Sequence, residues 1–326
     1  MKIRAVTCGL LALVLLGAAL ATAFVIRDRE SELITKRVLS AHAQTGVVLS
    51  QGLTHYQLAG PASAPLVVLV HGFSVPAYIW DPTFAALIDH GFQVLRFDLY
   101  GRGHSARPRV RYTLDLYSRQ LQELLEALHL HQVFTLVGLS MGGPVVTHFA
   151  NRHPSRIDAL VLVDPLVFPP KEYDVWPLTV PLLGEFMAGV YFIPHLAATQ
   201  ADDFFDKTRF PRWNARFTQQ MRYRGFRRAI LSTVRELVHT DTLGEYAKLG
   251  KLDRAVLLIW GKNDPVVPLS DSDKLRELVP RMDFHVIENA GHLSHMEQAD
   301  AFNLLLFDFL AAHQSAPRLK DAQDQP

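Results

Sequence analysis

The most reactive arrangement in this chain of 326 residues is a serine held between glycines. Ser140 stands in the Gly-Leu-Ser-Met-Gly segment 138–142, directly after the apolar run 134–137 and before a helical pattern that extends to about Asn151. A Gly-x-Ser-x-Gly turn between a buried strand and a helix holds the serine in a strained conformation and exposes its oxygen at the end of the sheet. Ser140 is therefore the predicted nucleophile.

A serine hydroxyl becomes a good nucleophile only when an imidazole takes its proton and an acid orients that imidazole. After such a turn the expected order along the chain is an acid and then a histidine. Asp264 follows the apolar run 255–260, and His292 follows the predicted strand 284–287. Both lie just beyond the carboxyl ends of strands, where open α/β sheets place their sites. The predicted triad is Ser140, Asp264 and His292.

An oxyanion hole is expected beside this serine. The aliphatic run 66–70 opens into His71-Gly72-Phe73. In this arrangement one donor is the backbone N–H after the nucleophile, and the other comes from the loop after an early strand. The sequence thus predicts the amides of Met141 and Phe73 as the two donors.

Together these residues resemble the α/β-hydrolase superfamily, in its branch with a serine nucleophile and a cap domain. The resemblance extends from about Leu53 to Ala312. It rests on His-Gly-Phe at 71–73, Phe-Asp-Leu-Tyr-Gly-Arg-Gly-His-Ser at 97–105, Gly-Leu-Ser-Met-Gly-Gly at 138–143, Val-Asp-Pro at 163–165, Gly-Lys-Asn-Asp-Pro at 261–265 and Ala-Gly-His at 290–292. It implies an α/β fold with a mostly parallel eight-stranded sheet flanked by helices and with an inserted helical cap.

The resemblance also chooses between neighbouring candidates for the triad. The Ala-Gly-His motif selects His292 over His295, three residues further on. Some members draw the acid from the position of Asp164, which also follows a predicted strand, but the later Asp264 is preferred.

Four residues near the motifs have weaker predictions. Trp80 and Tyr100 are candidates for lining the substrate pocket, with packing in the core as the alternative. Asp98 is expected to bind backbone amides of the loop 100–105. His71 is expected to fix its own loop.

The likeness of segment 138–143 implies an activity as well as a fold. It is similar to the corresponding turn of esterases, monoacylglycerol lipases, cofactor-free haloperoxidases and C–C bond hydrolases. Dehalogenases and epoxide hydrolases of this fold place an aspartate where Ser140 stands, which disfavours those activities. C–C hydrolases carry a Ser/Gly-rich loop that segment 73–77 does not match. The implied function is hydrolysis of a carboxylic ester through an acyl-enzyme. Aromatic residues in the segment 165–251 and a membrane tether would suit an ester of medium or long acyl chain, or a monoacylglycerol. The alternatives are C–C cleavage, perhydrolysis or acyl transfer with the same triad, and a membrane-tethered binding protein without turnover.

Composition limits the classes of ligand and cofactor that this chain is expected to bind. The formal net charge of +1 does not indicate nucleic acid, so the expected partner is a small-molecule acyl ester. Cys8 is the only cysteine, and the 15 histidines show no paired metal-ligand spacing. No dinucleotide or phosphate-loop motif is present, so neither a cofactor nor a metal is expected.

Residues 1–30 are predicted to be a signal anchor or a signal peptide. Lys2 and Arg4 precede an uncharged apolar run, 5–26. The run is longer than the roughly 7–15 residues of a secretory core and close to the roughly 20 of a membrane span. Length favours a single membrane helix with the catalytic domain outside a bacterial inner membrane. The small residues at 21–23 allow the alternative of secretion after cleavage.

The remaining chain is predicted to divide into a core and a cap. Strand and helix patterns alternate over 31–164 and 252–314, which predicts the sheet. The alternation stops in 165–251, the predicted helical cap. This cap has an aromatic first half and a helical stripe of Phe226, Ile230, Val234 and Leu237. It is either a lid over an acyl pocket or a subdomain that packs its own stripe. The polar tail 315–326 is predicted to be disordered.

Overall fold

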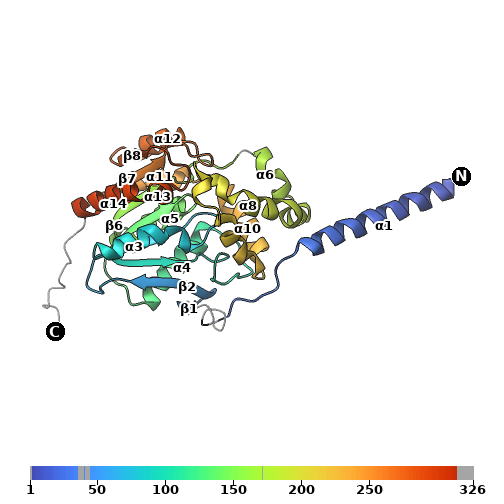
Figure 1. The fold of residues 1–326 in the computed structure, drawn as a ribbon, viewed down its shortest axis with the longest axis horizontal. Helices are drawn as coiled ribbons and strands as arrows, with labels where there is room; N and C mark the ends of the chain where they lie inside the picture. Colours follow the sequence, from blue (N-terminus) through green and yellow to red (C-terminus); the bar gives the residue numbers. More distant parts are fainter. Residues whose placement is uncertain (1, 36–39, 41–44, 171, 314–326) are drawn as a thin grey trace.

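The computed structural model describes residues 2–35, 40, 45–170 and 172–313. Within these residues, eight strands form one sheet in the order β1-β2-β4-β3-β5-β6-β7-β8 (Figure 1). The pairs from β4 through β8 are parallel, and β1 and β2 are antiparallel to their neighbours. The predicted mostly parallel, eight-stranded α/β sheet is confirmed. The strands are β1 (Thr45–Leu49), β2 (Gly52–Ala59), β3 (Leu66–Val70), β4 (Gln93–Phe97), β5 (Phe134–Leu139), β6 (Ile157–Val163), β7 (Ala255–Gly261) and β8 (Asp283–Ile287).

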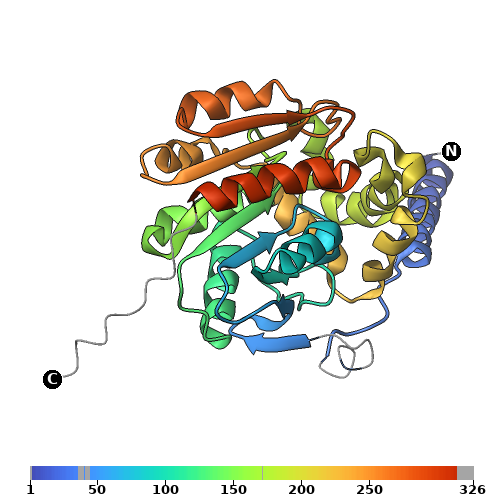
Figure 2. The same ribbon diagram turned by 60° about the vertical axis from the view of Figure 1, so that its left-hand side comes forward.

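The central strands are covered on both faces, which explains why β3 is wholly apolar and β5 nearly so. Every residue of β3, β4 and β5 is buried. Alternate residues of β3 enter two different hydrophobic clusters, because successive side chains of a strand point to opposite faces. Helices α4, α5, α11 and α12 pack on one face, and α3 and α14 pack on the other. Figure 2 shows α14, in red, lying across the sheet.

Helix α4 buries one side, and α5 is buried along nearly its whole length. In α4, Tyr117, Leu121 and Leu124 are buried, and Thr113 caps the helix by accepting a hydrogen bond from the Leu116 N–H. The helices of the two layers are α3 (Asp81–Asp89), α4 (Leu114–Ala127), α5 (Gly142–Arg152), α11 (Leu243–Leu249), α12 (Asp271–Leu278), α13 (Ser294–Glu297) and α14 (Ala299–His313).

The chain between β6 and β7 contains helices but adds no described strand to the sheet. We refer to residues 165–251 as the inserted segment. Phe226, Ile230, Val234 and Leu237 are all at least 98% buried, so the predicted stripe is a packed face. Its helices before α11 are α6 (Glu172–Thr179), α7 (Leu183–Met187), α8 (Ile193–Thr199), α9 (Trp213–Thr218) and α10 (Phe226–Thr233).

The prediction of an N-terminal membrane anchor is wrong. In the described part of the chain, no helix has the length and apolar character needed to cross a membrane. The N-terminal run forms α1 (Lys2–Arg27), and Figure 1 shows this helix extending away from the sheet. The last turns of α1 contact the inserted segment. Phe24 stacks on Phe186 with ring centroids 6.5 Å apart, and the Arg27 guanidinium donates to the Val190 carbonyl at 3.1 Å.

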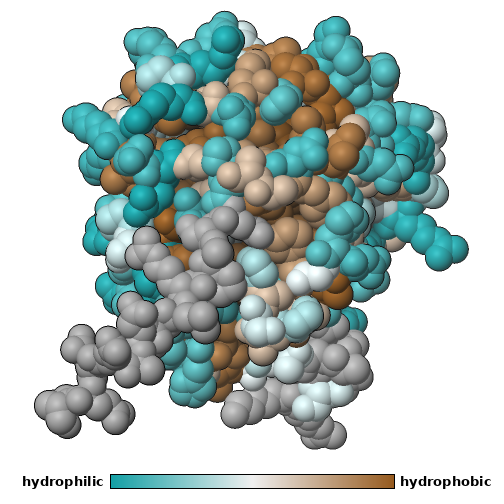
Figure 3. Space-filling model, turned by 90° about the vertical axis from the view of Figure 1, so that its left-hand side faces the viewer, coloured by the Kyte–Doolittle hydropathy of each residue, from teal (hydrophilic) through white to brown (hydrophobic). Residues whose placement is uncertain are grey.

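The predicted disordered tail, 315–326, lies outside the described residues. On the face drawn in Figure 3, hydrophobic residues run down the middle between hydrophilic sides. Mixed exposure of this kind is usual for folded proteins.

Candidate active site

Ser140 occupies the sharp turn between β5 and α5. Its φ of +53° lies in the left-handed region, which is strained for a residue other than glycine. The turn is fixed on both sides: the Ser140 N–H donates to the Val163 carbonyl at 2.9 Å, and the Gly143 N–H donates to the Ser140 carbonyl at 2.8 Å. A Cβ on Gly142 would lie 2.7 Å from the Val70 carbonyl oxygen, so this position needs glycine. The backbone thus presents one serine side chain at the carboxyl edge of the sheet.

The loop after β3 passes directly beside this serine. A Cβ on Gly72 would stand 3.1 Å from the Ser140 Cβ. The next residue, Phe73, is fixed by a hydrogen bond. The buried Arg102 guanidinium donates to the Phe73 carbonyl at 2.7 Å. Phe73 and Met141, the two residues whose amides the sequence predicts as oxyanion donors, both line the cavity at Ser140.

His71 and Asp98 hold the neighbouring loops. His71 Nδ1 lies 2.9 Å from the Gly72 carbonyl oxygen, and the Leu99 N–H donates to Nε2 at 2.9 Å. Burial lowers the pKa of His71 to about 4, so its imidazole is neutral at pH 7. Asp98 accepts hydrogen bonds from the backbone N–H groups of Ala77 and His104, each at 2.8 Å. The predicted bond from Asp98 to the loop 100–105 is present.

Asp264 and His292 form a close pair at the ends of β7 and β8. His292 Nδ1 lies 2.8 Å from Asp264 Oδ2, and both side chains are at least 93% buried. The second carboxylate oxygen of Asp264 accepts the N–H groups of Val266 at 2.7 Å and Val267 at 2.9 Å. The carboxylate is thereby fixed in the orientation that contacts the imidazole. No hydrogen bond between Ser140 and His292 is recorded among the described residues, and such bonds often tighten only when substrate binds.

The electrostatic surroundings of His292 are strongly negative. Burial by itself lowers the pKa of His292, but the charge and hydrogen bond of Asp264, with further contributions from Asp203 and Asp164, raise it to about 9. A cationic imidazole is therefore stabilised in this site.

Asp164, the alternative acid, is bound to other groups. Its two oxygens accept the Gly261 N–H at 2.6 Å and the Ser294 hydroxyl at 2.7 Å. Burial, followed by the nearby charge of Asp264, raises the pKa of Asp164 well above its usual range. Between the two candidates, only Asp264 is recorded with a hydrogen bond to His292 in the described chain.

A cavity of about 420 Å³ opens at Ser140. Phe73 and Met141 line it beside the serine, and Asp271 is the one charged residue in its described lining. The rest of the lining is apolar: Leu166, Phe168, Pro169, Pro170, Val238, Val266, Val267 and Pro268.

Trp80 and Tyr100 are not in this lining. Trp80 is fully buried against the His295 ring, with centroids 4.5 Å apart. Tyr100 is 1% exposed, within the hydrophobic cluster that includes α4. The structure gives both residues core positions instead of cavity positions, because their rings fill space between the sheet and its covering helices.

The inserted segment supplies contacts to His292 that sequence reasoning missed. The His292 N–H donates to the Asp203 carbonyl at 2.9 Å. Gln200, one turn earlier, accepts from the Ser74 hydroxyl at 2.9 Å and donates to the Asp203 carboxylate at 2.5 Å. This chain of bonds connects the loop of Phe73 to the backbone of His292.

Glu297 makes a second connection between the inserted segment and the histidine turn. Its carboxylate accepts the N–H groups of Phe205 and Asp206, each at 2.9 Å, and the Gly291 N–H at 2.6 Å. No local motif marks Gln200, Asp203 or Glu297, since each also bonds to a residue distant in sequence.

One group in the described residues has the spacing of a metal site. Ligand atoms of His55, Asp98 and His104 lie within 4.8 Å of one another. The same Asp98 carboxylate is in contact with His55 Nδ1 at 2.7 Å and accepts two backbone N–H groups. The hydrogen bonds of Asp98 thus have a structural role in the loop.

Comparison with known proteins identifies the family of this fold. Residues 65–299 match the family described as alpha/beta hydrolase fold. A 2-hydroxy-6-oxononadienedioate/2-hydroxy-6-oxononatrienedioate hydrolase of Dechloromonas aromatica (strain RCB) is 28% identical over 268 residues, which cover 78% of this chain and 90% of that protein. The monoacylglycerol lipase abhd6-B of Xenopus laevis is 25% identical over 274 residues, covering 80% of this chain and 79% of that one.

A solved structure resembles most of this fold. The enol-lactonase from Burkholderia xenovorans LB400 superposes with a TM-score of 0.71 at 24% identity, covering 82% of this chain and 100% of that chain. The family match spans most of the sheet and its helices, from β3 to the start of α14. The chain belongs to the α/β hydrolase fold family.

Proposed function

We propose that this protein is a serine hydrolase that cleaves an uncharged carboxylic ester through an acyl-enzyme intermediate. Ser140, Asp264 and His292 are the proposed triad, and the amides of Phe73 and Met141 the proposed oxyanion donors. The observation that carries the choice of substrate is the lining of the cavity at Ser140, which is apolar apart from the serine and Asp271.

The proposed reaction begins with proton transfer. His292 takes the hydroxyl proton of Ser140 while the serine oxygen attacks the acyl carbonyl. Asp264 holds the imidazole and stabilises its cationic form. The two amides bind the oxyanion, and each such donor contributes about 2.7–4 kcal/mol to the transition state. His292 then gives its proton to the leaving alcohol, and a water activated by the same imidazole releases the acid and regenerates Ser140.

The cavity favours a neutral acyl group. Among the described lining residues none is lysine, arginine or histidine, and the single charge, Asp271, would repel an anion. Burying a carboxylate without a partner is costly, whereas an alkyl chain gains about 0.8 kcal/mol for each buried CH₂. A medium or long acyl ester, including a monoacylglycerol, fits this lining better than a dicarboxylate.

C–C bond hydrolysis is the second candidate, because the relative from Dechloromonas aromatica is named as a hydrolase of a 2-hydroxy-6-oxo compound instead of an ester. Its named substrate is a dienedioate, which has two carboxylates. The absence of a basic side chain from the described cavity lining argues against such a substrate. Perhydrolysis and acyl transfer use the same acyl-enzyme and differ only in the acceptor.

We further propose that residues 165–251 act as the cap and that residues 31–164 and 252–314 form the catalytic core. Leu166, Phe168 and Val238 of the inserted segment line the cavity, whereas Ser140 and Val266 come from the core. The acyl pocket would thus be completed only when the two parts are in contact.

A series of p-nitrophenyl esters from acetate to palmitate tests the proposed substrate class. We expect turnover to rise from acetate to a medium or long chain, since each added CH₂ is buried against the apolar lining. The measurement is kcat/KM for each ester, compared with cleavage of 2-hydroxy-6-oxononadienedioate. Faster cleavage of that dioate than of every ester would contradict the proposal.

The pH dependence gives an independent prediction. His292 accepts the serine proton only when it is neutral, and the surrounding carboxylates raise its pKa to about 9. We therefore expect kcat/KM to rise with pH up to about 9. Burial raises the pKa of Asp203 to about 6, so Asp203 is charged over most of this range. Removing that charge in Asp203→Asn should lower the pKa of His292 and move the rise in kcat/KM to lower pH.

The adjacent Asp202→Asn is the matched control. Asp202 is exposed and binds Lys207, so its replacement should leave the midpoint unchanged. A fall in rate at all pH values without a moved midpoint would mean that Asp203 has only a structural role.

A further inference from the structure

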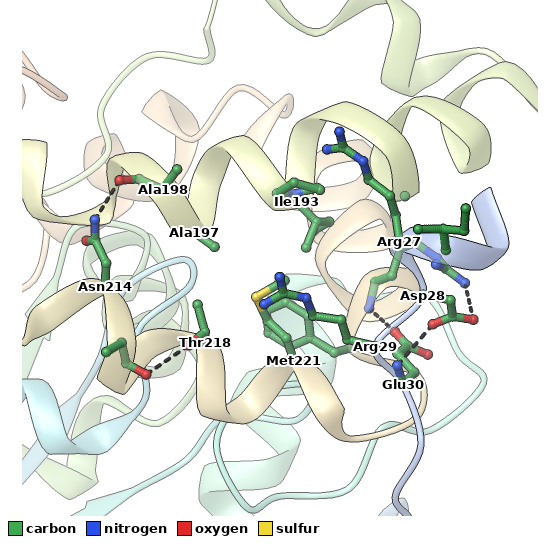
Figure 4. Close-up of a pocket in the computed structure, with 16 residues that line it drawn as sticks. Arg27, Asp28, Arg29, Glu30, Ile193, Ala197, Ala198, Asn214, Thr218 and Met221 are labelled. Atoms are coloured by element: carbon green, nitrogen blue, oxygen red, sulfur yellow. Dashed lines mark hydrogen bonds and ion pairs between the residues drawn. The ribbon is translucent and has the colours of Figure 1, made fainter. Parts of the chain in front are cut away.

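A second cavity, of about 530 Å³, lies between the end of α1 and the inserted segment. Figure 4 shows the residues that line it, with Arg27 to Glu30 on one side and α8 on the other. It shares no lining residue with the cavity at Ser140. Its volume falls within the roughly 300–1,000 Å³ of small-molecule sites.

One side of this cavity is apolar. Ile193, Ala197, Met221 and Phe226 line it, and each is at least 94% buried. These side chains come from α8, from α10 and from the turn before α10. They offer a surface suited to an alkyl chain.

The opposite side carries charges, most of which already have partners. Arg227 pairs with Asp28 at 3.5 Å, and Glu30 accepts the N–H groups of Gly225 and Arg227. Arg27 donates to a backbone carbonyl. The three arginines outnumber the two acids, so the lining is cationic.

Arg29 is the arginine that remains. It has no hydrogen bond or ion pair with any other residue that the structure describes. Arg29 and Met221, both labelled in Figure 4, line the same cavity, Arg29 with the charged residues and Met221 with the apolar ones. An unpaired guanidinium next to an apolar wall matches a ligand that has an anionic head and an alkyl chain.

The wall of this cavity is continuous with the contacts to His292. Helix α8 leads directly into residues Gln200–Asp203. Gln200 binds Ser74, and the Asp203 carbonyl accepts the His292 N–H. A ligand packed on α8 would therefore restrain the segment that contacts the proposed catalytic histidine.

We propose that this cavity binds a long-chain carboxylate, with Arg29 on the carboxylate and the chain on Ile193, Ala197 and Phe226. That the carboxylate is the acid released by the enzyme rests on the proposed function, whereas the binding itself does not. Product acid would then occupy a site separate from the catalytic cavity.

Isothermal titration of the full chain with dodecanoate tests the proposal. Arg29→Gln should weaken one site about tenfold, as expected for loss of one charge-assisted hydrogen bond. Ala198→Trp should abolish that site, because exposed Ala198 lines the cavity and the indole would fill it. Arg212→Gln is the matched control: Arg212 is an exposed arginine of the inserted segment outside the lining, and its replacement should leave binding unchanged.

Unaltered dodecanoate binding by both Arg29→Gln and Ala198→Trp would overturn the proposal, as would equally tight binding of dodecanol to the wild-type protein. Thermal unfolding of each variant shows whether it is folded. Ester hydrolysis is measured separately. If the protein hydrolyses no ester but the variants lose dodecanoate binding as expected, the proposed function is refuted. The proposed binding site then still stands.

Discussion

Replacement of Ser140 by alanine is expected to lower kcat for ester hydrolysis by about 10⁶-fold, with wild-type stability retained. The expected loss is this large because the serine oxygen forms the covalent bond of the acyl-enzyme, and no other described lining residue of the cavity is a serine, threonine or cysteine. The alanine variant should also lose covalent labelling by a fluorophosphonate probe. Intact-protein mass spectrometry measures the label, and a spectrophotometric assay measures the rate.

Ser118→Ala is the matched control for this experiment. Ser118 is 4% exposed and lies on α4, so the same hydroxyl is removed from an equally buried position outside the cavity at Ser140. Both rate and labelling should stay at the wild-type level in this variant. If Ser140→Ala still carries one probe on the same peptide, Ser140 is not the nucleophile.

The central strands β3 and β5 could be predicted closely because they are short, buried and mostly apolar. The run 66–70 coincides with β3, and the run 134–137 forms most of β5. Parallel strands covered on both faces give such uninterrupted signals. The sequence patterns of the inserted segment are weaker. Helices such as α7 and α9 contain five and six residues, too few to show a clear periodicity.

The candidate site could be predicted where a motif is local in sequence. The turn at Ser140 and the pairing of Asp264 with His292 follow from residues at strand ends, which the fold brings to one edge. Contacts between distant segments had no such signal. Asp203 and His292 are 89 positions apart, and only the packing of the inserted segment on the core brings them together. The run 5–26 was wrongly predicted to be a membrane anchor for a related reason. The absence of charged residues in a sequence does not show which parts of the protein its helix contacts.

Replacement of Asp264 by asparagine should reduce kcat by about 10⁴-fold, the effect expected when the acid of a triad is lost. The carboxylate accepts the Nδ1 proton of His292 at 2.8 Å, whereas an amide can turn its NH₂ toward the ring and favour the wrong tautomer. Loss of the negative charge also removes part of what raises the pKa of His292. The small remaining activity should therefore begin at a lower pH than in the wild type.

Asp164→Asn makes the same chemical change at the end of β6, one strand away from Asp264. Comparison of the two variants shows which aspartate is the acid of the triad. Burial, followed by the nearby charge of Asp264, raises the pKa of Asp164 and so favours its neutral form, for which a neutral amide of the same shape is a close replacement. The amide oxygen can still accept the Gly261 N–H, and the Ser294 hydroxyl can accept from the amide nitrogen. We expect kcat within about tenfold of wild type, with a lower melting temperature if these bonds are strained. A larger loss of kcat in Asp164→Asn than in Asp264→Asn, with both variants folded, would reassign the acid of the triad to Asp164.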